Sequence, residues 1–160
     1  MQYIKKAVAL CLVLLLFVGC QSTEQSPSIV YPFTAQVHIK GKGLTADGIL
    51  TASLLGCYTL EMTNPVSMKG LTFSCQNGKT QVEWDSWLSE REIAIPATGV
   101  FTQITAALDG AARRERPQHL TEETRVYRVD GHTVEWERAG DRLLRILLQD
   151  GTQVTVQYQS

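Results

Sequence analysis

The chain has 160 residues, with 15 basic and 16 acidic side chains and a net charge of −1 at neutral pH. This balance provides no positively charged surface for nucleic acid, so we expect no nucleic-acid partner. The roughly 140 residues that follow an apolar N-terminal run are enough for one domain with a hydrophobic core.

The N-terminus has the three parts of an export signal. Two lysines precede an unbroken apolar run from 7 to 18, and a glycine stands directly before Cys20. The window 17–20 resembles the lipobox of bacterial lipoproteins, although leucine is usual where Phe17 stands. The resemblance implies cleavage before Cys20 and a diacylglycerol thioether, and hence palmitate, on that cysteine.

This N-terminal run favours a lipid anchor over a membrane span. It has 12 residues, whereas a helix needs about 20 to cross a bilayer. Two acyl chains give stable attachment to a membrane. An ordinary secretory signal cut nearby, or an uncleaved N-terminal anchor, is the alternative.

These patterns divide the chain into three segments. Residues 1–19 form the predicted signal peptide, and 20–28 carry the lipidated cysteine and a polar, flexible tether. Residues 29–160 form one β-rich domain. We therefore expect a cell-envelope protein, anchored by its N-terminal lipid on the extracytoplasmic side of a bacterial membrane.

Strand patterns dominate the first half of the domain. Apolar and polar residues alternate from 33 to 40, and a Gly-Lys-Gly turn follows at 41–43. Further strands are predicted over about 48–55 and 57–63, where Asn64-Pro65 ends the third because proline has no amide hydrogen for a ladder.

Three hairpins are predicted from Asn-Gly and Asp-Gly dipeptides. The turn at Asn77-Gly78 brings largely apolar residues onto one face of the sheet. It sets Phe73 opposite Val82, Leu71 opposite Trp84 and Cys75 opposite Thr80. The turn at Asp130-Gly131 places Tyr127 opposite Val134. The turn at Asp150-Gly151 places Leu147 opposite Val154 and leaves Arg145 on an otherwise apolar face.

One helix is predicted over about 99–113, because apolar residues recur there at three- and four-residue spacing. Thr98 is the expected N-cap. About five strands, this helix and four more strands predict an α+β, mainly β fold. We expect a curved antiparallel sheet, or half-barrel, with the helix packed on its concave face.

This layout, from Phe33 to about 112, resembles the LolA/LolB-type lipoprotein-carrier fold and the related lipid-binding envelope lipoproteins of mycobacteria. It is still more similar to uncharacterised envelope lipoproteins of Gram-positive bacteria. The resemblance implies a half-barrel with an apolar concave side. It supplies no functional residues, and the chain is shorter than the carriers.

The residues themselves suggest no catalytic chemistry. No serine lies in a nucleophile elbow and no two histidines stand at a metal-ligand spacing, so we expect no enzyme, metal or cofactor. Cys57 and Cys75 are either a disulfide or two free thiols.

We therefore expect a protein that binds an apolar or amphipathic ligand, such as a lipid or acyl chain, between sheet and helix. The alternative is a non-catalytic interaction or scaffold module of an envelope complex, with a filled core. Trp84 either lines a cavity mouth or packs in the core. The expected lining is Phe33, Val37, Phe73, Val82, Trp84, Phe101, Ile104 and Leu108.

Overall fold

The computed structural model describes residues 31–41, 43–84, 87–88, 96, 98–114, 117–138 and 142–158. The predicted signal peptide of residues 1–19, the lipidation site Cys20 and the tether to residue 28 lie outside these residues. No helix within the described ranges is long and apolar enough to cross a membrane.

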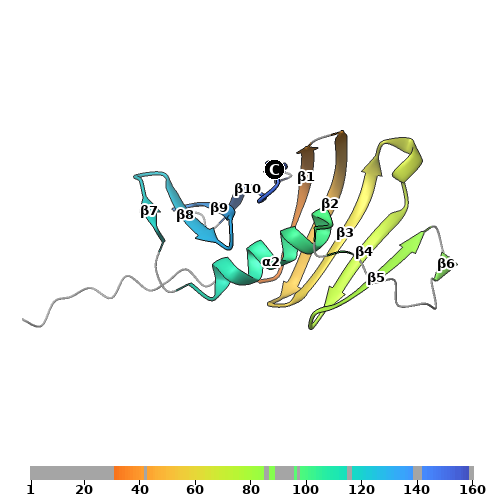
Figure 1. The fold of residues 1–160 in the computed structure, drawn as a ribbon, viewed down its shortest axis with the longest axis horizontal. Coiled ribbons are helices and arrows are strands. Elements are labelled where there is room, and N and C mark those ends of the chain that lie inside the picture. The colour runs from red at the N-terminus through yellow and green to blue at the C-terminus, as the bar shows by residue number, and fades with distance from the viewer. Residues whose placement is uncertain are drawn as a thin grey trace, which may run out of the picture.

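The described strands form one antiparallel sheet of 11 strands, in the order β6-β5-β4-β3-β2-β1-β11-β10-β9-β8-β7 (Figure 1). The mainly β fold is as predicted, with two short edge strands in addition. The strands are β1 (Phe33–Gly41), β2 (Leu44–Leu54), β3 (Cys57–Asn64), β4 (Leu71–Gln76), β5 (Lys79–Trp84), β6 (Trp87–Leu88), β7 (His119–Leu120), β8 (Thr124–Val129), β9 (His132–Glu137), β10 (Leu143–Leu147) and β11 (Gln153–Gln157).

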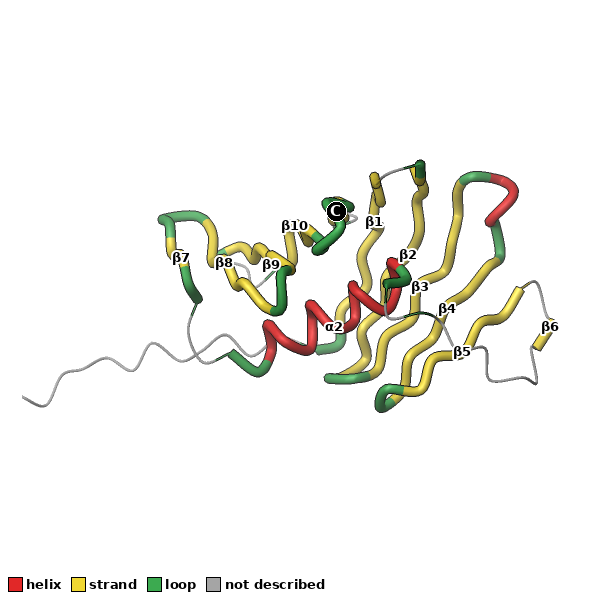
Figure 2. Tube along the Cα trace, in the orientation of Figure 1, coloured by secondary structure: helices red, strands yellow, loops and turns green. Residues whose placement is uncertain are grey.

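Chain connectivity explains the position of the helix. The two edge strands, β6 and β7, are consecutive in sequence, so the segment between them must travel from one side of the sheet to the other. This segment contains α2 (Val100–Ala112), which lies across the sheet (Figures 1 and 2). A short 3₁₀ helix, η1 (Val66–Met68), links β3 and β4.

Helix α2 packs closely on β8 and β9 near its C-terminal end. A Cβ atom added to Gly110 would lie 2.2 Å from Cγ1 of Val129, so only glycine permits this approach. The predicted N-cap is wrong by one residue, because Gly99 is the N-cap and makes no side-chain capping bond. The Gln103 side chain instead donates to the Thr98 carbonyl at 2.8 Å.

Two of the three predicted hairpins have the expected register. Asn77 and Gly78 both have positive φ, as do Asp130 and Gly131, which is the type I′ pattern. The pairs Phe73–Val82, Leu71–Trp84, Cys75–Thr80 and Tyr127–Val134 are all directly opposite, as predicted.

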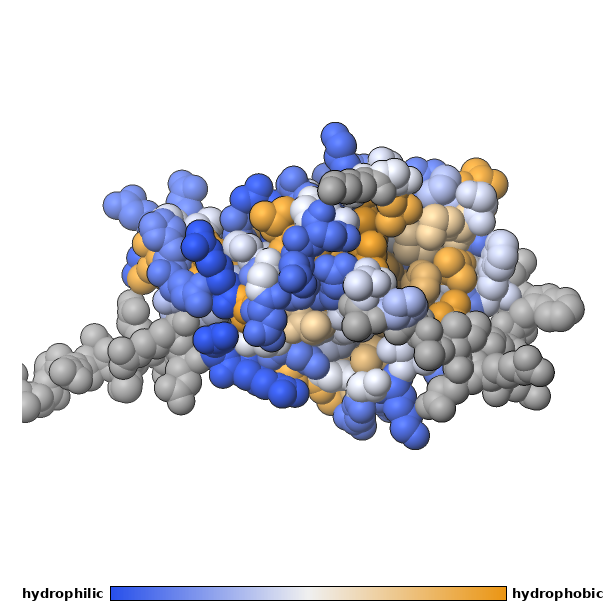
Figure 3. Space-filling model, in the orientation of Figure 1, coloured by the Kyte–Doolittle hydropathy of each residue, from blue (hydrophilic) through white to orange (hydrophobic). Residues whose placement is uncertain are grey.

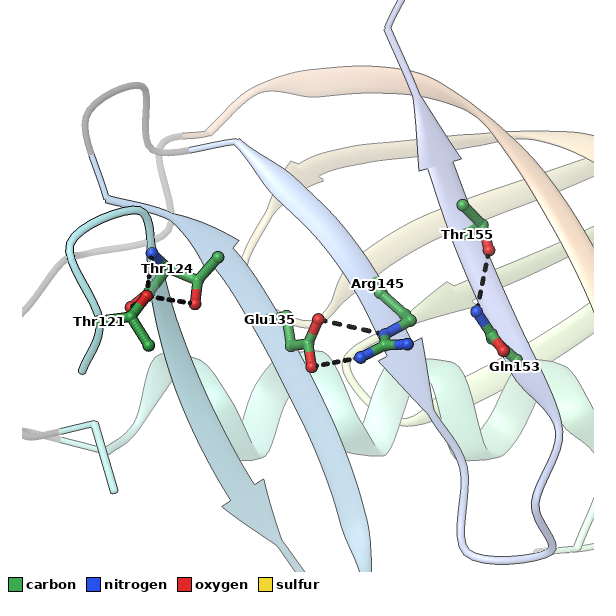
Figure 4. Close-up of polar contacts among 6 residues, drawn as sticks. All are labelled: Thr121, Thr124, Glu135, Arg145, Gln153 and Thr155. Carbon is green, nitrogen blue, oxygen red and sulfur yellow. Dashed lines mark hydrogen bonds and ion pairs between the residues drawn. The ribbon is translucent and has the colours of Figure 1, made fainter. Parts of the chain in front are cut away.

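The third hairpin differs from its prediction by one residue. Leu147 lies opposite Gln153, and Ile146 lies opposite Val154. The loop has three residues, because the Leu148 amide donates to the Thr152 carbonyl and only Gly151 has positive φ. This shift turns Arg145 to the convex face, where its Nη2 lies 2.6 Å from Oε1 of Glu135 (Figure 4).

The disulfide left open between Cys57 and Cys75 does not form, and both cysteines are free. The strand register gives the reason. Cys75 lies opposite Tyr58, and Cys57 lies opposite Gln76, so the two thiols belong to opposite faces of the sheet.

Candidate functional site

The concave face of the sheet, partly covered by α2, is the candidate site. All eight residues predicted to line it lie on this face or on the helix above it. Phe33 and Val37 come from β1, Phe73 from β4, and Val82 and Trp84 from β5, while α2 supplies Phe101, Ile104 and Leu108. Alternation along each strand places these apolar side chains on one face.

Burial falls steeply along this face toward β5. Ile104 and Leu108 are fully buried, and Val37 and Phe101 are 2% and 3% exposed. Phe33, Phe73 and Val82 are only partly buried, and Trp84 is 55% exposed. The helix therefore fills one part of the concave face and leaves the part on β4 and β5 accessible. This exposure excludes the reading of Trp84 as a core side chain.

The boundary between the two parts is aromatic. Phe101, in the first turn of α2, stacks on Phe73 of β4 with ring centroids 5.6 Å apart and planes 29° apart. Figure 3 shows apolar side chains at the surface over β2 to β4, beside the N-terminal end of α2.

A second aromatic group lies at the end of β1. The Phe33 ring stacks with Tyr31 at 6.3 Å and meets the edge of Trp136, also at 6.3 Å. Trp136 is buried, whereas Tyr31 and Phe33 keep part of their surface in solvent. Phe33 thus belongs to the rim of the concave face and Trp136 to its core.

Sequence reasoning missed the polar contact that holds the helix over this face. Asp109 of α2 accepts hydrogen bonds from the Tyr58 hydroxyl at 2.5 Å and from the Gly56 amide at 3.2 Å. The hydroxyls of Tyr31 and Tyr58 lie 3.2 Å apart. No local pattern could have revealed partners separated by about fifty positions in the chain.

Burial and the bond to Asp109 together raise the pKa of Tyr58 far above its ordinary value. Burial also raises the pKa of Tyr31. Both hydroxyls therefore stay protonated at neutral pH, which lets Tyr58 donate to the carboxylate. These hydrogen bonds position α2 over the sheet.

The described residues contain no group of three or more histidine, cysteine, aspartate or glutamate side chains placed to hold a metal ion. The accessible part of the concave face is lined by aromatic and aliphatic groups. Such a lining suits contact with an apolar surface.

Comparison with known proteins gives one kind of match. No family model matches the chain, and no curated protein matches it in sequence. Among solved structures, the chain is similar to a LolA superfamily protein, NE2245 from Nitrosomonas europaea. The two share 12% sequence identity over 81% of this chain and 84% of that one, with a TM-score of 0.43.

Proposed function

We propose that this protein binds an apolar or amphipathic ligand, such as a lipid or acyl chain, on the concave face where α2 meets β4 and β5. One observation carries the proposal: burial declines along the apolar concave face, from Val37 of β1, which is 2% exposed, to Trp84 of β5, which is 55% exposed. Accessible apolar surface next to a few fixed polar groups is the usual design of a lipid or cofactor site.

The hydrophobic effect of covering the accessible apolar surface favours the binding of such a ligand. Trp84, Phe73 and Val82 all retain accessible surface. Covering about 100 Å² of this apolar surface would contribute about 2.5 kcal/mol.

Native mass spectrometry of the full-length protein purified from cells tests this proposal. We expect bound lipid in the wild-type spectrum and its loss in Trp84→Asp. Leu147→Asp is the matched control, because Leu147 is 42% exposed but lies on the convex face, paired with Gln153. If the wild type carries no bound lipid, or if both variants lose it equally, the result would favour the interaction module with a filled core.

The second part of the proposal concerns location. We propose that Cys20 carries the lipid that attaches the domain to the extracytoplasmic side of a membrane, with 21–28 as the tether. Metabolic labelling with a palmitate analogue tests it. Label is expected in the wild type and absent from Cys20→Ala; label that persists in Cys20→Ala would contradict the anchor.

A further inference from the structure

The convex face carries a cluster of three polar side chains that the proposed lipid site does not use. His38 of β1 and Asp47 of β2 are directly opposite each other, and Asp47 is also opposite Asn64 of β3. Nδ1 of His38 lies 2.6 Å from Oδ1 of Asp47, and the Asn64 amide donates to Oδ2 at 2.9 Å. Both carboxylate oxygens are therefore engaged within the cluster.

The cluster opens into a hollow of about 320 Å³. The side chains of His38 and Asp47 are 45% and 42% exposed, so a ligand in solvent can reach them. The volume lies at the small end of the range for ligand pockets, which is about 300–1,000 Å³. The hollow is lined by Gln36, Val37, His38, Asp47, Gly48, Ile49, Thr63 and Gln157.

An irregularity in the sheet shapes this hollow. Asp47 lies opposite Asn64, but the next residue, Gly48, lies opposite Met62, so Thr63 is an extra residue in β3. Such bulges redirect side chains and are frequent beside functional sites. Gly48 also has no room for a side chain, because a Cβ atom there would lie 2.7 Å from the Glu61 carbonyl oxygen.

Asp47 fixes the orientation and the tautomer of His38. The hydrogen bonds from His38 and Asn64 lower the pKa of Asp47, so its carboxylate is ionised and can only accept. Nδ1 of His38 therefore carries the hydrogen of the 2.6 Å contact. In the neutral ring, Nε2 is then a hydrogen-bond acceptor, and it is not the ring atom that contacts the Asp47 carboxylate.

The other polar groups of the hollow are uncharged. Gln36 and Gln157 lie directly opposite each other on β1 and β11, and each amide offers both donors and an acceptor. Thr63 adds a hydroxyl, and the half-buried Ile49 adds apolar surface. The charged neighbours Lys40 and Glu61 are not part of the lining.

We propose that this hollow binds a neutral, hydroxyl-rich ligand, a carbohydrate, through Nε2 of His38 and the amides of Gln36 and Gln157. A sugar hydroxyl can donate to Nε2 and to an amide carbonyl while it accepts from an amide N–H. Both oxygens of the single carboxylate already accept hydrogen bonds within the cluster, which leaves the uncharged groups of the hollow to contact a ligand. The site is independent of the proposed lipid site, because it lies on the opposite face of the sheet.

NMR titration of the full-length protein tests this site directly. The probes are glucose, N-acetylglucosamine, maltotetraose and chitotetraose, so that free sugars are distinguished from segments of a glycan chain. We expect at least one probe to shift the His38 ring signals and the Gln157 side-chain amide signals in a saturable way. No saturable shift with any of the four probes would overturn the proposal.

Variants assign the binding to the named groups. Both His38→Leu and Gln157→Ala should bind the same probe about tenfold more weakly, the effect of losing one hydrogen bond. Gln153→Ala is the matched control, because Gln153 lies on the same strand and face but outside the hollow, where its amide contacts Thr155 at 3.4 Å (Figure 4). Equal affinity in His38→Leu and the wild type would contradict the site.

The role of Asp47 has its own readout. Ring ¹⁵N shifts should show hydrogen on Nδ1 of His38 in the wild type and a move toward Nε2 in Asp47→Leu, with weaker sugar binding. An unchanged tautomer in Asp47→Leu would show that the carboxylate does not position the ring.

Discussion

The two parts of the concave face differ in how completely α2 covers them. Under the C-terminal part of the helix, Tyr127, Val134 and Ile146 are buried together with Leu108. Over β4 and β5, at the other end, the face ends in partly exposed aromatic side chains. One helix can fill only one part of a sheet of this width, because it crosses the strands and has 13 residues.

This difference suggests separate roles for the two parts, with the covered part serving stability and the uncovered part the proposed binding. The covered part supplies the close packing that a domain of this size needs. The uncovered part contributes less to folding, and it is the part that we propose binds a ligand. The following predictions test this separation, from the largest expected effect to the smallest.

Leu108→Ala should cause the largest loss of stability. Leu108 is fully buried between helix and sheet, so its truncation leaves a cavity and costs about 2–5 kcal/mol. Urea unfolding followed by circular dichroism measures the change. A loss below about 1 kcal/mol would mean that this part of the core is not closely packed.

Gly110→Ala should destabilise the same part by about 1–3 kcal/mol, because the new methyl group would overlap Val129. Alanine otherwise favours a helix over glycine. Truncation of the partner in Gly110→Ala/Val129→Ala should therefore relieve the overlap. Additive losses in that double variant would argue against close contact between α2 and β8.

Alkaline pH should weaken the contact between the helix and β3. The pKa of Tyr58 is raised in the folded state, so the folded protein holds this proton more tightly than the unfolded chain does. The stability that protonated Tyr58 contributes is present below the unfolded pKa of about 10 and is lost as pH rises above that value. Urea midpoints across this range should fall less in Tyr58→Phe. Equal slopes in the two proteins would contradict the contact.

Trp84→Ala should have the smallest effect on stability. The side chain is 55% exposed, so we expect a change of about 0.5 kcal/mol or less in urea unfolding. The same variant should lose affinity for lipid. A large loss of stability would show that Trp84 serves folding and not binding.

Local sequence patterns predicted those parts of the fold that local chemistry decides. The type I′ turns at Asn77-Gly78 and Asp130-Gly131 fixed their registers, because both residues of each turn accept positive φ. At Asp150-Gly151 the same dipeptide lies in a three-residue loop, where the Asp150 carboxylate accepts from the Thr152 amide at 2.8 Å. The dipeptide alone does not distinguish these two loops.

The candidate sites were predictable to different degrees. Alternation placed the strand residues of the expected lining on one face of the sheet. The His38–Asp47 pair also had a signal, because the Gly-Lys-Gly run at 41–43 indicates a chain reversal. The register that sets Gly41 opposite Leu44 also sets His38 opposite Asp47. The contact between Asp109 and Tyr58 had none, since it depends on where the helix crosses the sheet.

Fluorescence quenching by brominated palmitate tests the account most directly. The variant Trp87→Phe keeps two tryptophans, Trp84 and Trp136, which are 55% and 5% exposed in the wild-type protein. The account predicts saturable quenching that disappears in the double variant Trp84→Phe/Trp87→Phe. No quenching, or quenching that persists in that double variant, would contradict a lipid site on the uncovered part of the concave face.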